Sequence, residues 1–137
     1  MADRHKMEKF RSQAPVGKNP IQVLTPTSAH PAWPRRLDER LGAAAPSWLW
    51  AIGDPGILAE QKVAVFCSVR CPGNAILKAY DAARKLRDEG VTVVSGFHSP
   101  VEKECLRILL RGKQPVVICL ARAMEKIPAT IRLAYRS

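Results

Sequence analysis

The sequence lacks any long hydrophobic run. Its uninterrupted apolar stretches, such as Val116–Ala121, fall far short of the ~18 to 20 residues that a membrane-spanning helix needs. The first twenty residues carry charges but no apolar segment like the one in a secretory signal peptide. These two absences predict a chain without a membrane partner that is located in the cytoplasm.

Cysteine is also scarce. The four residues, Cys67, Cys71, Cys105 and Cys119, lie in or beside expected core elements. In a reducing compartment this placement favours free, buried thiols over a disulfide framework. Cys67 and Cys71 together with His98 would give zinc three ligands at best, in an unusual spacing, so no metal is expected.

Acidic residues are few relative to basic ones. The chain has 12 Asp and Glu against 22 Lys and Arg, a formal net charge of +10. Such an excess favours a polyanionic partner such as nucleic acid. It is concentrated after Glu104, where seven basic residues face only Glu125, so one end of the domain is expected to be strongly positive.

What the sequence does contain is an alternation of strand-like and helix-like segments between Lys62 and Gly112. Two apolar runs each lead through a loop of small residues into an amphipathic helix, a pattern typical of an α/β domain with a mostly parallel sheet. The expected strands cover residues 47–52, 62–67, 91–95 and 116–120. The nearly all-apolar strand 62–67 is predicted to be central and covered on both faces.

Local signals mark the ends of the two helices. Asn74 is expected to cap the first helix, and Gly90 suits its left-handed stop position. The second helix is expected to begin with a capping box over Ser99–Glu102, with proline at the first helical position, and to run to about Gly112. A chain of 137 residues has room for one domain, which we predict over 21–137. Residues 1–20 are polar and basic without a hydrophobic period, so we predict a disordered arm there.

The loops after the strands are the expected site. In a parallel sheet they emerge on one edge, where helix N-termini attract anions such as phosphate. The candidate phosphate or DNA contacts are Ser68, Arg70, Gly73, Ser95, Gly96, Phe97, His98, Ser99, Arg122 and Lys126. Arg70 leads this set, because it has no capping duty and offers a planar fork to phosphate, whereas Ser99 is better explained as a helix cap.

Two residues of the loop after Ser95 have open alternatives. Phe97 can stack on a nucleobase or pack against the end of the sheet. His98 can act as a general base, stack on a base, or be an ordinary polar loop residue.

Several common cofactor and catalytic motifs are missing. No G-x-G-x-x-G follows Phe66, no acidic residue closes the third strand, and no P-loop motif occurs. No pair of carboxylates suited to hydrolysis stands out either. The sequence therefore predicts no cofactor and no catalytic residue, and it favours a protein that is not an enzyme.

Four motifs, in order, resemble the DNA-processing protein DprA (Smf) family. The matching pieces are His30–Leu37, Pro46–Gly53, Val63–Arg70 and Val93–Gly96, set against the family patterns Y-P-x-x-L, P-x-x-L-x-x-x-G, V-A-x-V-G-S-R and V-V-S-G. The chain departs from the third pattern, with cysteine for glycine and one inserted residue in Cys67–Arg70. It looks like a short, divergent member that lacks the helical and winged-helix modules of longer relatives.

The resemblance implies a Rossmann-like, three-layer domain. It further implies single-stranded DNA binding in a positively charged pocket at the sheet edge, in DNA uptake or recombination, and a RecA-type recombinase as partner. Formation of a homodimer is left open. Ser68, Arg70, Ser95 and Gly96 are the phosphate contacts carried over from the family motifs.

Two other functions stay open on the sequence alone. One is a nucleotide-binding sensor or nucleotide-processing enzyme that uses the same pocket, with His98 or Glu102 assisting. The related phosphoribohydrolases carry a P-G-G-x-G-T-x-x-E motif that is absent here, which weakens this alternative. The other is a protein-interaction module in which an exposed Trp33 or the N-terminal arm docks a partner.

Overall fold

A computed structural model describes residues 21–26 and 32–121. The chain divides into two compact units, which we describe separately. Residues 21–26 and 32–59 belong to the first unit, and residues 60–121 to the second. The predicted arm 1–20, and with it Arg122 and Lys126, lies outside the described residues, and the prediction of a single domain over 21–137 stays a prediction.

The first unit contains a two-stranded antiparallel sheet. Strand β1 (Ile21–Leu24) pairs with β2 (Leu49–Ile52), with Ile21 opposite Ile52. The remaining elements are α2 (Arg36–Leu41) and the short 3₁₀ helices η1 (Gly42–Ala44) and η2 (Pro55–Leu58). The strand predicted over 47–52 is therefore confirmed, but it pairs with a strand that we did not predict, and not with the parallel sheet.

Trp33 is buried in the first unit. Its side chain is only 7% exposed, and its indole Nε1 donates a hydrogen bond of 2.7 Å to Asp38 Oδ2. An indole has a large apolar body and one polar N–H, so it is most stable where the body is covered and the N–H has an acceptor. The expectation of an exposed Trp33 that docks a partner is wrong.

The second unit is α/β, as predicted. Its elements are β3 (Lys62–Ala64), α3 (Gly73–Asp88), β4 (Thr92–Ser95), α4 (Pro100–Leu109) and β5 (Val116–Ile118). The three strands form a parallel sheet in the order β3-β4-β5, with Val93 of β4 opposite both Val63 and Val116.

The central strand is β4, and the prediction that 62–67 is central is wrong. Val93 is completely buried, whereas Val63 is 42% exposed. An uninterrupted apolar run is expected of a strand covered on both faces, but here it occurs on a strand at the sheet edge. The regular strand β3 is also shorter than predicted, since it ends at Ala64.

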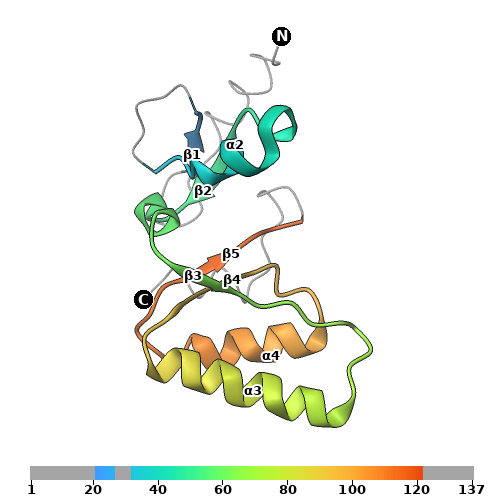
Figure 1. Cartoon of the computed structure of the whole chain (residues 1–137). Coiled ribbons are helices and arrows are strands. Elements are labelled where there is room, and N and C mark those ends of the chain that lie inside the picture. Colours follow the sequence, from blue (N-terminus) through green and yellow to red (C-terminus); the bar gives the residue numbers. More distant parts are fainter. Residues whose placement is uncertain (1–20, 27–31, 122–137) are drawn as a thin grey trace. The chain divides into compact units, whose positions relative to one another are not determined.

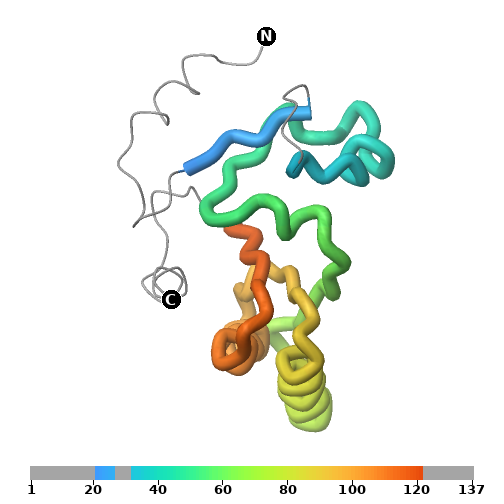
Figure 2. Tube along the Cα trace, turned by 90° about the vertical axis from the view of Figure 1, so that its left-hand side faces the viewer, coloured from blue at the N-terminus to red at the C-terminus, as the bar shows by residue number. Residues whose placement is uncertain are grey.

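Helices α3 and α4 lie side by side on the same face of the parallel sheet (Figures 1 and 2). Between the helices, Ala83, Val101, Cys105 and Ile108 form one buried cluster. Between α4 and the sheet, Val93, Phe97, Leu106 and Leu109 form a second cluster. Each buried Val, Leu, Ile or Phe side chain in these clusters stabilises the fold by roughly 1.5–3 kcal/mol.

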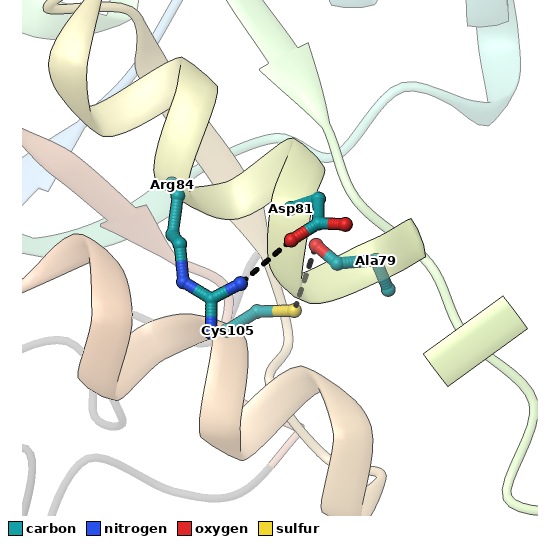
Figure 3. A network of polar contacts seen from close by, with 4 residues as sticks. All are labelled: Ala79, Asp81, Arg84 and Cys105. Carbon is teal, nitrogen blue, oxygen red and sulfur yellow. Dashed lines mark hydrogen bonds and ion pairs between the residues drawn. The ribbon is translucent and has the colours of Figure 1, made fainter. Parts of the chain in front are cut away.

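The two helices also make a polar contact where they meet. The Cys105 thiol on α4 lies 3.8 Å from the backbone oxygen of Ala79 on α3, and the nearby ion pair between Arg84 and Asp81 lies within α3 (Figure 3). No described helix is long and apolar enough to cross a membrane.

The predicted helix boundaries hold at three of four points. Helix α3 stops before Gly90, which has a φ of +71°, and α4 begins with the capping box of Ser99 and Glu102 and ends at Leu109, close to the predicted point. Asn74 is not the cap of α3. The helix begins two residues earlier than a cap at Asn74 would place it, at Gly73, because the extended Pro72 takes the capping position. The Pro72 side chain makes no capping hydrogen bond.

Candidate functional site

The parallel strands bring two loops to one edge of the sheet. The loop between β3 and α3 (residues 65–72, the β3–α3 loop) and the loop between β4 and α4 (residues 96–99, the β4–α4 loop) both follow the carboxyl ends of neighbouring strands. This is the edge at which ligands bind in open α/β sheets. The parallel pairing of β3 with β4 confirms that these two loops share one edge, as the sequence analysis expected.

Glu102 connects these two loops. Its Oε1 accepts a hydrogen bond of 2.7 Å from the backbone N–H of Cys67, which lies 35 residues away in the sequence. Its Oε2 accepts hydrogen bonds from the backbone N–H groups of His98, at 2.7 Å, and Ser99, at 3.2 Å. The carboxylate of this buried residue therefore occupies the N-terminus of α4.

The ionised state of Glu102 is favoured in this position. Burial of the carboxyl opposes ionisation, but the hydrogen bonds from the backbone N–H groups of Cys67, His98 and Ser99 outweigh it, so the pKa of Glu102 is lowered. The N-terminus of α4 thus holds an anion supplied by the protein. Glu102 is fully engaged in this contact, which disfavours the alternative in which it assists a hydrolytic reaction.

Two serines of the predicted set have structural partners. Ser95 is buried, and its Oγ accepts a hydrogen bond of 3.1 Å from the backbone N–H of Phe97. Ser99 is also buried, and its Oγ accepts a hydrogen bond of 3.2 Å from the backbone N–H of Glu102. Ser99 therefore caps α4, as the sequence analysis favoured.

Phe97 and His98 point to different surroundings. Phe97 is 4% exposed and packs in the cluster with Val93, Leu106 and Leu109. Of its two predicted roles, the structure therefore shows packing against the sheet, and its ring is not open to stack on a base. His98 is exposed, and its imidazole lies so close to Gly96 that a side chain at that position would collide with it. Gly96 therefore makes room for the His98 ring.

The β3–α3 loop holds most of the accessible residues of the predicted site. Ser68 and Arg70 are exposed, and Ser68 Oγ accepts a hydrogen bond of 3.3 Å from the backbone N–H of Arg70. Helix α3 begins at the exposed Gly73, and no described residue accepts a hydrogen bond from the first two backbone N–H groups, those of Gly73 and Asn74. The loop therefore presents a guanidinium, a hydroxyl and free helix N–H groups to solvent.

Basic side chains of the described residues lie at both ends of the second unit. Arg107 forms an ion pair of 2.7 Å with Glu104. Arg111 and Lys113 follow α4, and so lie at the edge opposite the two loops. At the loop edge, no described carboxylate pairs with Arg70 or with Lys103 in the first turn of α4. Of the basic residues after Glu104, the described ones all lie in or just after the last turn of α4, namely Arg107, Arg111 and Lys113. The others lie outside the described residues, so the strongly positive end stays a prediction.

The cysteines are free thiols, as predicted, but not all are buried. Cys105 is buried, Cys67 and Cys71 are half-buried, and Cys119 is exposed. A hydrogen bond with the Cys71 side chain, followed by burial, raises the pKa of the Cys67 thiol. Within residues 21–26 and 32–121, no group of three or more His, Cys, Asp or Glu side chains is placed to hold a metal ion.

The sequence analysis missed two features of this edge. One is the contact between Glu102 and Cys67, which joins residues far apart in the sequence. The other is Phe66, which is 83% exposed at the start of the β3–α3 loop. No sequence signal singled out Phe66, because residues 63–67 are all apolar and show no alternation.

The described edge is thus that of a parallel α/β protein with a cationic loop at the carboxyl ends of its strands. Comparison with protein families gives a match to the family DNA recombination-mediator protein A over residues 24–135. This match covers most of the chain and runs through both compact units, so the chain belongs to the DprA family, a family of DNA-processing proteins. No curated protein sequence matches the chain.

Proposed function

We propose that this protein binds single-stranded DNA through the β3–α3 loop and the start of α3, acting in DNA uptake or recombination in the cytoplasm. The observation that carries the proposal is the exposed Arg70, which no described carboxylate neutralises and which lies beside Ser68 and the uncapped N-terminus of α3. Guanidinium groups and helix N–H groups are the protein groups best suited to phosphate oxygens.

Other predicted parts of the site have a supporting role in this proposal. Ser95, Gly96, Phe97 and Ser99 shape the β4–α4 loop, and His98 is its accessible side chain. The sheet would belong to a Rossmann-like, three-layer domain, of which the described residues supply the sheet and one helical layer. A RecA-type recombinase and a second copy of the chain remain predicted partners.

The test is a binding titration with a fluorescent single-stranded oligonucleotide. Arg70→Ala should weaken binding by about tenfold or more, because a charge-assisted hydrogen bond to phosphate contributes roughly 1.5–3 kcal/mol. Arg111→Ala is the matched control, since it removes an exposed arginine at the opposite edge of the sheet. Equal effects of the two substitutions would contradict the proposed site.

A mononucleotide competitor separates DNA binding from the nucleotide-binding alternative. Contacts to several phosphates give a steep loss of affinity with salt, and a free mononucleotide competes poorly against them. Complete displacement at low mononucleotide concentration, with a shallow salt dependence, would favour the nucleotide sensor or enzyme.

A further inference from the structure

Phe66 is an exposed aromatic side chain that no described residue covers. With 83% of its surface accessible, it is the most exposed large apolar residue in the described part of the chain, and Val69, three residues later, is 77% exposed. Burying such a ring is favourable, so its exposure leaves an apolar surface available to a ligand.

Phe66 directly precedes a segment of the β3–α3 loop that is held at both ends, by Cys67 and Cys71. At one end the backbone N–H of Cys67 donates to Glu102, and the Cys67 side chain packs against the cluster between α3 and α4. At the other end the Cys71 side chain packs against the same cluster. Because these anchors face inward, the residues between them, Ser68 to Arg70, are presented to solvent.

This arrangement places an apolar, planar surface and a cation on one short, anchored loop. A ligand that matches both has a flat apolar face beside an anionic group, and a nucleotide unit has this combination. An apolar protein partner would match Phe66 and Val69 but would leave the adjacent Arg70 without a counter-charge. The cationic neighbour and the net charge of +10 therefore favour a nucleic acid.

We infer that Phe66 stacks on a base of the bound strand while Arg70 contacts an adjacent phosphate, so that the loop selects single-stranded over duplex DNA. This inference rests on the proposed function, and it adds a physical reason why the protein would prefer single-stranded DNA. The faces of bases in a duplex are covered by their neighbours, whereas a single strand can turn a base onto an aromatic ring.

The test compares Phe66→Ala, Phe66→Leu and Phe66→Trp on three probes: an oligothymidine, an abasic oligonucleotide of the same length, and a duplex. The Ala and Leu variants should lose about tenfold in affinity for oligothymidine, the range that base stacking on an aromatic side chain supplies, and the Trp variant should keep it. All three should bind the abasic strand like the unmodified protein, because that strand has phosphates but no bases. Their affinity for the duplex should also be unchanged.

Leu77→Ala is the matched control, since Leu77 is another exposed apolar residue, on the outer surface of α3. Its affinity for oligothymidine should be unchanged, and thermal unfolding should show that all variants fold. Equal binding of oligothymidine by Phe66→Ala and the unmodified protein, with Arg70→Ala still impaired, would overturn the stacking inference and leave the proposed function standing. If the unmodified protein binds no oligonucleotide, both fail.

A protein-docking role for Phe66 gives a different result. In that case Phe66→Ala would abolish self-association in sedimentation velocity runs without changing DNA affinity. This result would also overturn the stacking inference.

Discussion

Phe97 combines a buried ring with an unusual backbone conformation. Its φ is +51°, in the left-handed region that favours glycine, and it is the only described residue other than glycine with a positive φ. The conformation is maintained because the ring packs against Val93, Leu106 and Leu109, while its N–H donates to Ser95 Oγ. A strained backbone here turns the ring into the core and not toward a ligand.

We therefore expect Phe97→Ala to lower the free energy of unfolding by about 3–5 kcal/mol, since it removes a buried ring and leaves the strained backbone in place. Phe66→Ala should change it by no more than about 0.5 kcal/mol, because Phe66 is exposed. Urea unfolding of both variants checks this contrast. Comparable destabilisation by the two would mean that Phe66 is covered in solution.

At the scale of elements, Glu102 joins the start of α4 to the β3–α3 loop. Glu102→Gln keeps the size of the side chain but replaces one oxygen with an amide NH₂, which cannot accept a hydrogen bond. At least one of the buried backbone N–H groups of Cys67, His98 and Ser99 then loses its acceptor. We expect the variant to be about 1–3 kcal/mol less stable at neutral pH, as measured by urea unfolding.

The same contact predicts a pH dependence. The pKa of Glu102 is lower in the folded protein than in the unfolded chain, where it lies near its usual value of about 4.3. Its stabilising contribution is therefore fully present above that value, and it is lost as the pH falls from there through the lower folded pKa. The stability difference between the unmodified protein and Glu102→Gln should narrow as the pH falls from about 5 to about 3. A difference that stays constant over this range would show that the charge of Glu102 is not what stabilises the loop.

The elements that the sequence predicted well are those with local signals. The capping box at Ser99 and the glycine after α3 lie next to the helix ends that they define, so a short stretch of sequence is sufficient to recognise them. The pairing of β1 with β2 joins Ile21 to Ile52, which are far apart in the sequence. The position of β3 as an outer strand of the three-stranded sheet depends on which strands lie beside it in space. Neither has a local signal, and neither was predicted.

The same division applies to the candidate site. The location of Ser68 and Arg70 follows from the rule that loops after parallel strands share one edge. The reach of Glu102 to Cys67 and the inward turn of Phe97 depend on tertiary packing and on one backbone angle, which residue type and spacing do not reveal.

At the scale of the whole molecule, the net charge of +10 and its distribution make separate contributions to DNA binding. Net charge acts at long range and speeds association with any polyanion, whereas contacts to individual phosphates determine how steeply affinity falls with salt. Two pairs of exposed basic residues distinguish these effects. Arg70 and Lys103 lie at the loop edge, and Arg111 and Lys113 lie at the opposite edge of the same unit.

We expect the double variant Arg70→Gln/Lys103→Gln to reduce the slope of log affinity against log salt by about one to two, because each lost phosphate contact removes roughly one unit. The double variant Arg111→Gln/Lys113→Gln removes the same two charges and should leave the slope nearly unchanged. The measurement is a salt titration of both variants and the unmodified protein with a short oligonucleotide, which has too few phosphates to reach both edges at once. Equal slopes for the two double variants would mean that binding follows net charge, and that the carboxyl edge of the sheet is not the DNA-binding surface.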